Sequence, residues 1–341
     1  MTSDLPLSLT EAEFLSLAAE HPVVPVAVEV LGDRETPVAL FEKLAGDGDG
    51  FLLESVEGGE RWGRWSFVGW EPAFTLTARN GRCAVDRRVA VPPGDPLTVL
   101  EAMIARYRTP HAASLGLGAA APPLHTGAVG YLAYDVVRYV EHLPHRPEDD
   151  RGLPEMMWQF VGAIAAVDRF RDRVVLMRNV FVDEDPRAQY REAVAALVDD
   201  VARIGAPHAY PLRAEPSFTE RPVAKATMSR EEFEAAVVRA VEYIRAGDAF
   251  QVVPSIRLDV DFDGDAFSVY RALRIVNPSP FMYFVRSGSL AVAGSSPELM
   301  SRVRDGIAYS RPIAGTIPRG SSPGEDEDLE ARLLADPKEI A

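Results

Sequence analysis

The chain has 341 residues, a length typical of about two domains of roughly 150 residues each. It carries 51 acidic and 36 basic residues, a net charge of −15, and such a surface repels phosphate backbones and anionic lipid headgroups. We therefore expect neither nucleic acid nor a membrane among its partners. The single cysteine excludes an internal disulfide framework and any multi-cysteine zinc or iron–sulfur site.

The N-terminal segment has no features of an export signal. Met1 to Glu20 carries four acidic residues and no lysine or arginine, and its apolar residues follow a helical spacing. No run of about 18 consecutive apolar residues, the length that crosses a membrane, occurs in the chain. We therefore expect a cytoplasmic protein, in which Cys83 is a small packed side chain.

The first part of the chain alternates predicted helices with short predicted strands. Thr10 and Glu13 have the spacing of a capping box, which predicts a helix from Thr10 to His21. Further helices are predicted at Pro96 to Tyr107 and Pro186 to Ile204, each with an aspartate directly before the proline. Runs rich in aromatic and β-branched residues predict strands at Phe51 to Leu53, Trp65 to Trp70, Phe74 to Ala78, Gly127 to Tyr134, Met157 to Val167 and Val174 to Val182.

A break in periodicity divides the chain. The segment from Gly205 to Thr227 is rich in proline and has no regular spacing of apolar residues, as is typical of a linker. We therefore predict an N-terminal lobe at residues 1–204, a linker at 205–227 and the first part of a second lobe at 228–341.

After the linker, Ser229 and Glu232 form a second capping-box pattern, which predicts a helix that ends at Gly247. A strand is predicted from Ala249 to Leu258, followed by a helix that begins at Asp265 and ends at the helix-breaking pair Asn277 and Pro278. Four more strands are predicted at Phe281 to Arg286, Leu290 to Ala293, Leu299 to Arg304 and Ile307 to Arg311, the last two joined by an Asp305-Gly306 type I′ turn.

Motifs for nucleotide-binding glycine loops, serine hydrolases and zinc proteases are absent from the sequence. Two clusters of turn-forming residues lie in the last quarter, at Gly294 to Glu298 and at Arg311 to Thr316. Each borders a predicted strand, where backbone N–H groups can approach an anion and the lone carboxyl group of Glu298 can donate a proton. From the residue types alone, two ordinary hairpin corners are the simpler interpretation, because Gly, Ser and Pro are the usual turn residues.

Seven motifs follow one another along the chain: Leu52 to Ser55, Glu60 to Phe67, Gly247 to Val253, Asn277 to Met282, Gly294 to Glu298, Arg311 to Thr316 and Leu334 to Glu339. In this order they resemble component I of anthranilate synthase, within the family of chorismate-utilising enzymes. The resemblance implies an α+β fold of two lobes, with β-sheets packed face to face and helices outside. The second lobe is expected to be incomplete.

The resemblance also implies a reaction. Chorismate, a dicarboxylate, would lose its ring hydroxyl while ammonia adds to the ring, and loss of pyruvate would then give anthranilate in tryptophan biosynthesis. Glu298 resembles the general acid of the family, and Thr316 with Ala314 and Gly315 resembles the substrate-binding turn. A Mg²⁺ ion and a glutaminase subunit that supplies the ammonia are expected with it.

Two positions discriminate among the relatives. Gln251 stands where the water-using relatives carry a lysine base, and a neutral amide cannot act as that base, which favours ammonia. Ala314 stands where aminodeoxychorismate synthases carry a lysine, which argues against a lysine adduct. Two alternatives stay open: an aminodeoxyisochorismate synthase of secondary metabolism, and a catalytically inactive tryptophan-binding fragment.

A second set of residues resembles the pocket in which tryptophan inhibits this family. A carboxylate for an α-ammonium group, a hydroxyl group and an apolar floor suit a free amino acid. The residues are Glu54, Ser55, Asn277, Pro278, Pro280, Phe281 and Met282.

Some features depart from the family pattern. Ile256 and Ile317 stand where relatives usually carry Gln and Arg. Family members continue beyond Ala341, and the metal-binding glutamates are expected there, so no metal ligand is assigned within this sequence. We therefore expect an N-terminal fragment that is inactive alone.

Overall fold

The structure, a computed structural model, describes residues 5–56, 63–210, 222–313 and 315–340. Two compact units make up the chain: Met1–Tyr210 together with Leu273–Ala341, and Pro211–Ala272. Helices and antiparallel sheets combine in the first unit, so the predicted α+β class is confirmed. No helix in the described ranges is long and apolar enough to cross a membrane.

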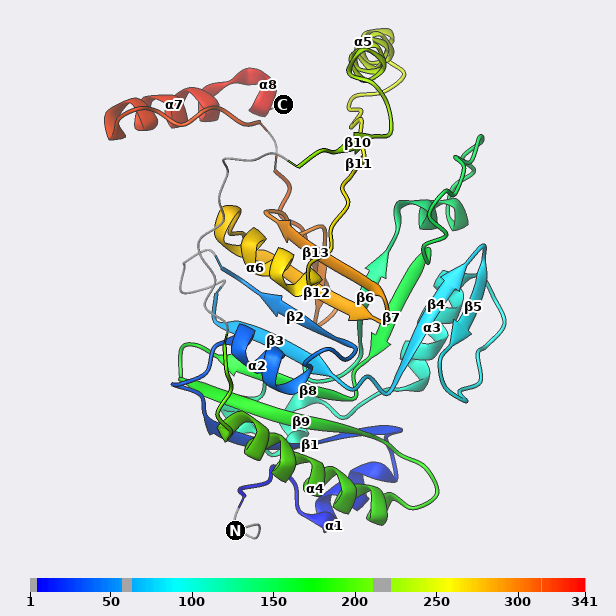
Figure 1. The fold of residues 1–341 in the computed structure, drawn as a ribbon, viewed down its shortest axis with the longest axis vertical. Helices are drawn as coiled ribbons and strands as arrows, with labels where there is room; N and C mark the ends of the chain where they lie inside the picture. Colours follow the sequence, from blue (N-terminus) through cyan, green and yellow to red (C-terminus); the bar gives the residue numbers. More distant parts are fainter. Residues whose placement is uncertain (1–4, 57–62, 211–221, 314, 341) are drawn as a thin grey trace. The chain divides into compact units, whose positions relative to one another are not determined.

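A seven-stranded antiparallel sheet organises the first unit (Figure 1). β2 joins two sets of strands, because it pairs with β3 on one side and with β12 on the other. Strands that we placed in the second lobe therefore belong to the same sheet as strands of the first lobe. Across the sheet the order is β1 (Val23–Leu31), β9 (Arg173–Phe181), β8 (Ala163–Asp168), β3 (Trp65–Trp70), β2 (Gly50–Glu54), β12 (Phe281–Ser287) and β13 (Leu290–Ser296).

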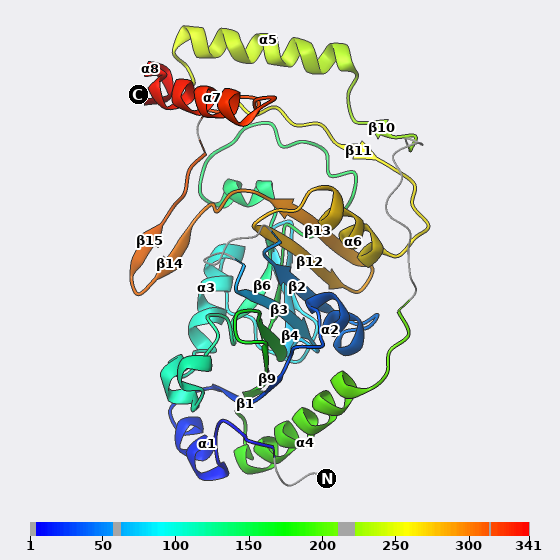
Figure 2. The same ribbon diagram turned by 90° about the vertical axis from the view of Figure 1, so that its left-hand side faces the viewer.

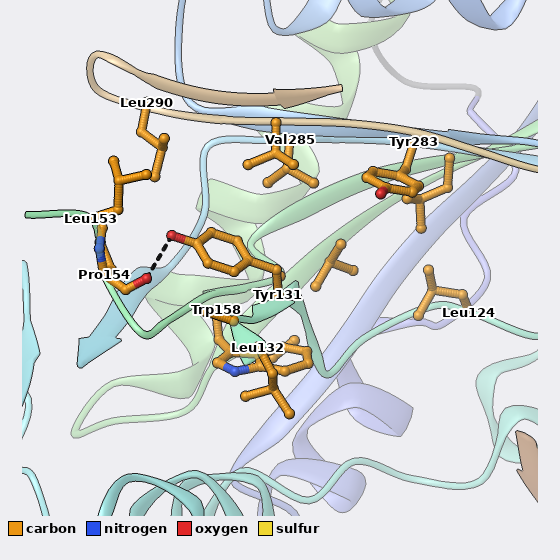
Figure 3. Close-up of a pocket in the computed structure, with 15 residues that line it drawn as sticks. Leu124, Tyr131, Leu132, Leu153, Pro154, Trp158, Tyr283, Val285 and Leu290 are labelled. Atoms are coloured by element: carbon orange, nitrogen blue, oxygen red, sulfur yellow. Dashed lines mark hydrogen bonds between the residues drawn. The ribbon is translucent and has the colours of Figure 1, made fainter. Parts of the chain in front are cut away.

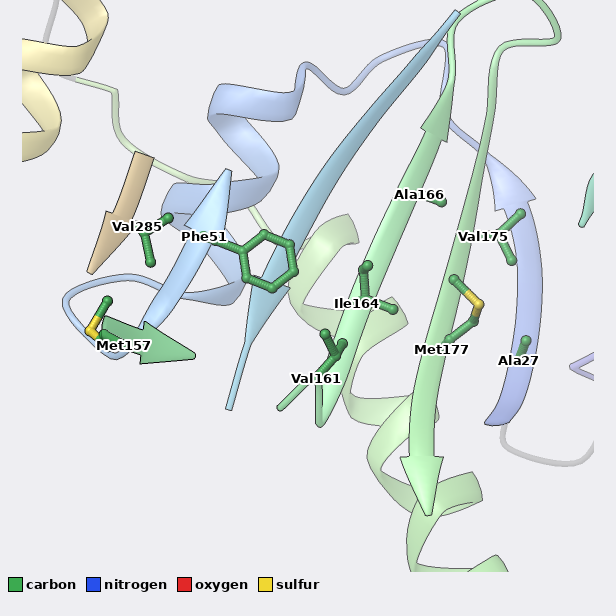
Figure 4. Close-up of a cluster of buried hydrophobic side chains, with 9 residues drawn as sticks. All are labelled: Ala27, Phe51, Met157, Val161, Ile164, Ala166, Val175, Met177 and Val285. Atoms are coloured by element: carbon green, nitrogen blue, oxygen red, sulfur yellow. The ribbon is translucent and has the colours of Figure 1, made fainter. Parts of the chain in front are cut away.

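A four-stranded sheet packs against one face of the larger sheet. Its order is β5 (Arg82–Val85), β4 (Phe74–Arg79), β7 (Met156–Phe160) and β6 (Ala128–Leu132). The core between the sheets takes side chains from both, because strand side chains alternate between faces and one face of each sheet is apolar. Figure 4 shows the buried members of this core: Ala27, Phe51, Met157, Val161, Ile164, Ala166, Val175, Met177 and Val285.

The predicted strand from Met157 to Val167 is two strands in two different sheets. The chain turns from β7 into β8 at Val161 and Gly162. Only glycine fits the second position, because a Cβ atom there would lie 2.1 Å from the carbonyl oxygen of Glu71. A run that is apolar throughout has no periodicity to mark such a corner, and the single-strand prediction was wrong for that reason.

Helices begin where the capping residues predicted them. Thr10 and Glu13 form both hydrogen bonds of a capping box at α1 (Glu11–Ala18). Asp95 and Asp185 accept backbone N–H groups at the starts of α3 (Pro96–Arg106) and α4 (Pro186–Gly205). These side chains satisfy N–H groups that have no partner within the helix.

The helices from α1 to α4 in the first unit cover outer faces of the sheets. α3 packs on the four-stranded sheet through Val99, Leu100 and Met103. On the larger sheet, Phe41 of α2 (Pro37–Leu44) meets Phe284 of β12 edge to face, with ring centroids 5.5 Å apart. α1 and α4 lie side by side in Figures 1 and 2. Short 3₁₀ helices lie at Ala112–Leu115, Gly118–Ala120 and Tyr134–Tyr139.

The glycine–aspartate segment before β2 anchors the β12–β13 hairpin. Asp49 accepts hydrogen bonds from the Gly288 backbone N–H at 2.8 Å and from the Ser287 hydroxyl at 3.2 Å. The guanidinium of Arg286 donates to the carbonyl oxygen of Gly48 at 2.9 Å. These contacts fix the hairpin to the segment that leads into β2, and so support the β2–β12 pairing.

The second unit contains the helix that the second capping-box pattern predicted. Ser229 and Glu232 form the capping box of α5 (Arg230–Ala246), and Gly247 ends the helix with a φ of 84°. The predicted strand from Ala249 to Leu258 was wrong, because only β11 (Leu258–Asp259) pairs there, with β10 (Lys225–Ala226). Pro254 lacks an N–H group, and most of the side chains in this stretch are exposed. α6 (Ala266–Val276) extends across the boundary between the units.

The C-terminal part of the first unit contains the predicted hairpin. β14 (Arg302–Arg304) pairs with β15 (Ile307–Tyr309), and the turn residues Asp305 and Gly306 have φ values of 51° and 76°. Two positive φ values identify the type I′ turn that the sequence predicted. Two helices follow, α7 (Pro323–Ala335) and α8 (Pro337–Ile340).

A buried ion pair fastens α4 to the larger sheet. The Nε and Nη2 atoms of Arg178 in β9 donate to the two carboxylate oxygens of Asp200 in α4, both at 2.7 Å. The Asp200 side chain is fully buried, and the Arg178 guanidinium also lies over the ring of Trp70. Removing one member of such a pair leaves an uncompensated charge in the interior.

We expect Asp200→Ala to lower the free energy of unfolding by about 3 kcal/mol, because the Arg178 guanidinium would lose its buried carboxylate and, among the described residues, keep only the exposed Glu71 as an ion-pair partner. Its neighbour Asp199 is exposed on the same helix. Asp199→Ala is therefore the matched control and should change stability by no more than about 0.5 kcal/mol. Urea unfolding followed by circular dichroism measures both, and equal losses for the two variants would contradict the assignment.

Candidate functional site

The residues predicted to bind an inhibitor meet where β2 ends and β12 begins. Glu54, the last residue of β2, lies opposite Met282 of β12. The backbone N–H of Val56 donates to the carbonyl oxygen of Ser279 at 3.1 Å, which continues the pairing beyond the strands. Antiparallel pairing thus brings Glu54 and Ser55 next to a segment that follows far later in the chain.

The segment from Asn277 to Pro280 leads from α6 into β12. The Asn277 backbone N–H donates to the carbonyl oxygen of Leu273 at 2.9 Å, and Pro278, which has no N–H, ends the helix. The Ser295 hydroxyl donates to the carbonyl oxygen of Asn277 at 2.7 Å. The turn is therefore fixed to β13 as well as to β2, while Asn277 and Pro278 themselves are exposed.

The predicted residues divide between the two faces of the sheet. Side chains alternate along a strand, so Ser55 and Phe281 belong to the face that carries Leu53 and Tyr283. This face is turned toward the four-stranded sheet. Glu54 and Met282 belong to the opposite face, toward the helices. A single ligand on one face would therefore touch only part of the predicted set.

Glu54 is held between two arginines. Its carboxylate accepts hydrogen bonds from Arg274 at 2.9 and 3.2 Å and from Arg169 at 2.8 Å. The Glu54 side chain is fully buried, whereas the arginines keep 30% and 35% of their side chains exposed. An ammonium group at this carboxylate would have to replace a guanidinium. Neither arginine was predicted as a partner of Glu54, because both lie far from it along the chain.

A second ion pair supports the turn that carries Arg169. Arg64 donates to Asp168 at 2.9 Å through its Nε atom, and the Phe170 backbone N–H donates to the same carboxylate. Burial by itself raises the pKa of Asp168, but the hydrogen bonds and the charge of Arg64 outweigh burial and lower the pKa below its usual value. Asp168 therefore stays ionised and holds the turn beside Glu54.

A cavity of about 750 Å³ lies between the two sheets of the first unit (Figure 3). Leu53, Tyr283 and Val285 line one side, and Tyr131 and Trp158 line the other. The Tyr131 hydroxyl donates to the carbonyl oxygen of Pro154 at 3.1 Å. None of the described lining side chains is charged, so nothing in this cavity offsets the two carboxylates of a dianion. It suits an apolar group, and the face that carries Ser55 lines it.

Glu298, the predicted acid, lies just after β13. Its side chain is exposed, and its carboxylate accepts a hydrogen bond from the Ile313 backbone N–H at 3.0 Å. This bond joins the two turn clusters that the sequence singled out, since Ile313 belongs to the Arg311 to Thr316 motif. The carboxyl group of Glu298 thus lies at the edge of the predicted substrate-binding turn.

Glu339 approaches the same turn from α8. A Cβ atom on Gly315 would lie 2.2 Å from the carboxyl carbon of Glu339, which shows how closely this side chain approaches the turn. Thr316 is exposed, and Ala314 lies outside the described residues. The sequence placed Glu339 in a family motif but gave it no role. Only the folded chain brings its carboxylate to Gly315.

Gln251 belongs to the second unit, and its side chain is exposed in a segment without regular structure. The structure therefore does not bring Gln251 and Glu298 together in one unit. In the described ranges, no group of three or more His, Cys, Asp or Glu side chains could hold a metal ion.

A family model and curated relatives match most of the chain. The family described as chorismate binding enzyme matches residues 50–341. Anthranilate synthase component 1 of Mycobacterium tuberculosis is 41% identical over 357 aligned residues, which cover 100% of this chain and 68% of that protein. The corresponding protein of Acetivibrio thermocellus is 36% identical over 339 residues, covering 95% of this chain and 66% of its own length. The chain thus spans about two thirds of the relatives it matches.

Solved structures give a matching result. Anthranilate synthase component I from Streptococcus pneumoniae superposes with a TM-score of 0.66 at 25% identity, over 91% of this chain and 65% of that chain. The menaquinone-specific isochorismate synthase from Escherichia coli has a TM-score of 0.55 at 14% identity, over 97% of this chain and 64% of that chain. The second likeness concerns the fold alone.

We expect Glu54→Gln to lower the free energy of unfolding by about 1–3 kcal/mol, because Arg169 and Arg274 would face each other without a carboxylate between them. Glu20 is exposed, and Glu20→Gln should change stability by less than about 0.5 kcal/mol. Thermal or urea unfolding of both variants gives the comparison. If Glu54→Gln is as stable as the parent chain, the two arginines do not depend on this carboxylate.

Proposed function

Since the chain belongs to the chorismate binding enzyme family, we propose that it is part of an anthranilate synthase, which converts chorismate and ammonia into anthranilate, pyruvate and water. The overall exchange balances: the ring hydroxyl leaves as water, the nitrogen of ammonia takes a place on the ring, and the enolpyruvyl side chain leaves as pyruvate. Identity to curated anthranilate synthase components over nearly the whole chain supports this reaction over that of the isochorismate synthase, which is a more distant match.

The position of Glu298 supports its assignment as the proton donor in the proposed reaction. A hydroxide ion is a poor leaving group, so the ring hydroxyl needs a proton as it departs. Glu298 is a carboxyl group at the edge of the turn that holds Gly315 and Thr316. In this mechanism Glu298 gives the proton, while the backbone of the turn and the Thr316 hydroxyl donate hydrogen bonds to a substrate carboxylate.

Gln251 would select the nucleophile. Water is a weak nucleophile until a base removes a proton, whereas neutral ammonia is nucleophilic enough to add without that help. A neutral amide at this position supplies no base, and so favours addition of ammonia. The same chemistry suits an aminodeoxyisochorismate synthase, whose product keeps the enolpyruvyl group, and product analysis separates the two.

We also propose that the enzyme requires Mg²⁺ and a separate glutaminase subunit. A divalent cation supplies charge that offsets the carboxylates of chorismate. Hydrolysis of glutamine by a cysteine enzyme needs a thiolate, but burial, followed by the charges of Asp95 and Glu155, raises the pKa of Cys83. The chain therefore depends on a partner for ammonia. The low cysteine content fits our proposal of a cytoplasmic location.

We expect Glu298→Gln to lower anthranilate formation by about 10²-fold or more in the intact enzyme, since the amide cannot donate the proton. The assay supplies chorismate, ammonium and Mg²⁺ and follows anthranilate by fluorescence, with products identified by mass spectrometry. Glu330 is an exposed carboxylate on α7, and Glu330→Gln should keep the parent rate. Unchanged activity of Glu298→Gln would remove the residue from the mechanism, and an aminated product that retains the enolpyruvyl group would favour the alternative enzyme.

We propose further that the end of β2 contributes to a tryptophan site that regulates the enzyme. Ser55 has a buried hydroxyl with no hydrogen-bond partner among the described residues. A buried polar group without a partner costs free energy, which a ligand can recover. Phe281 shares the face of Ser55, and this face lines the apolar cavity, whose walls suit an indole ring.

We expect Ser55→Ala to weaken tryptophan binding by about 5-fold or more, in keeping with the loss of one hydrogen bond of roughly 1 kcal/mol. The same variant should not be less stable than the parent chain, because the hydroxyl has no partner to lose in the described structure. Ser289→Ala, in the exposed turn of the β12–β13 hairpin, is the control. Isothermal titration calorimetry measures the affinity. Equal affinity of Ser55→Ala and the parent chain would place the site elsewhere.

A further inference from the structure

A smaller cavity of about 320 Å³ lies in the first unit, at the ends of β7 and β9. It shares no lining residue with the apolar cavity between the sheets, and none of its lining residues belongs to the proposed active or inhibitor sites. Its volume is at the lower end of the range for small-molecule sites, enough for one ring. The lining residues are Ile104, Tyr107, Arg108, Thr109, Thr126, Gly127, Phe160 and Phe181.

Three aromatic side chains form the wall of this cavity. The ring of Tyr107 meets Phe181 with centroids 5.2 Å apart and Phe160 at 5.9 Å, both edge to face. Phe160 in turn stacks on Phe74, at 4.3 Å between centroids. Rings that pack against each other in this way are fixed in orientation, and they offer edges and faces to a further planar ring.

The cavity has a single charged lining residue, the arginine Arg108. Within the described ranges Arg108 has no ion-pair partner, although the protein as a whole carries a net charge of −15. Arginine binds carboxylates through two parallel hydrogen bonds. Next to it, the hydroxyl of Thr109 is buried, and no described residue accepts or donates a hydrogen bond there.

We propose that this cavity binds a small aromatic carboxylate. The ring lies against Tyr107, Phe160 and Phe181, and the carboxylate takes hydrogen bonds from Arg108 and from the Thr109 hydroxyl. The charge of the site favours an anion over other small planar ligands, because Arg108 would repel a cation and a neutral ring would leave the buried Thr109 hydroxyl without a partner. The site is independent of the proposed reaction, since it uses other residues.

Benzoate is the probe, added to the 341-residue chain and followed by isothermal titration calorimetry and saturation-transfer NMR. We expect one binding site, with Arg108→Gln weakening the affinity at least 10-fold and Thr109→Val several-fold. Arg88 is exposed, does not line the cavity and makes no ion pair in the described structure, so Arg88→Gln is the control of equal charge change and should bind like the parent chain. Arg108 is exposed, so its variant should fold, which circular dichroism verifies.

Two analogues test the two halves of the proposal. Cyclohexanecarboxylate keeps the charge but lacks the flat ring, and benzyl alcohol keeps the ring but lacks the charge, so both should bind at least several-fold more weakly than benzoate. The proposal is overturned if benzoate does not bind, if Arg108→Gln binds it as well as the parent, or if Arg88→Gln loses as much affinity as Arg108→Gln. Chorismate turnover in the intact enzyme has no bearing on any of these outcomes.

Discussion

The antiparallel pairing of β2 with β12 is the interaction on which the rest of the structure depends. The pairing closes a loop of more than half the chain, and closing this loop costs conformational entropy. Local contacts alone do not offset that cost. Burial of Phe51 and Val285 between the sheets, together with the contacts of Asp49 and Arg286 at the hairpin, stabilises the pairing. Every feature at the ends of these strands follows from it, including the meeting of Ser55 with Phe281.

The two faces of the sheet at this pairing carry different kinds of side chain, charged on one face and apolar on the other. On the helix side, a buried carboxylate is neutralised by two arginines, which makes Glu54 a structural anchor. On the other side, the described lining of the apolar cavity carries no charge, and the Ser55 hydroxyl on the same face has no hydrogen-bond partner among the described residues. Glu54 and Ser55 are neighbours in the sequence, but their side chains lie on different faces of the sheet, because side chains alternate along a strand.

Apolar and polar sites are also separated along the chain. None of the described residues that line the cavity between the sheets is charged, whereas the turn at Ile313 and Gly315 has two carboxyl groups, Glu298 and Glu339, beside its backbone. An exposed turn with backbone donors suits a polar substrate, and an apolar cavity suits an aromatic ring. The proposed tryptophan site and the proposed catalytic turn thus use different parts of one unit.

The sequence by itself determined the helix starts at Thr10, Asp95 and Ser229, the type I′ turn at Asp305 and the family, because capping, turn chemistry and motifs are encoded in neighbouring residues. It missed β1 and α2, and it merged β7 with β8. Only the tertiary structure decided that β12 joins β2, that Arg169 and Arg274 hold Glu54, and that Glu339 reaches Gly315. Each of these depends on residues distant in the chain, whose meeting is set by burial and strand pairing across the whole unit and leaves no local pattern.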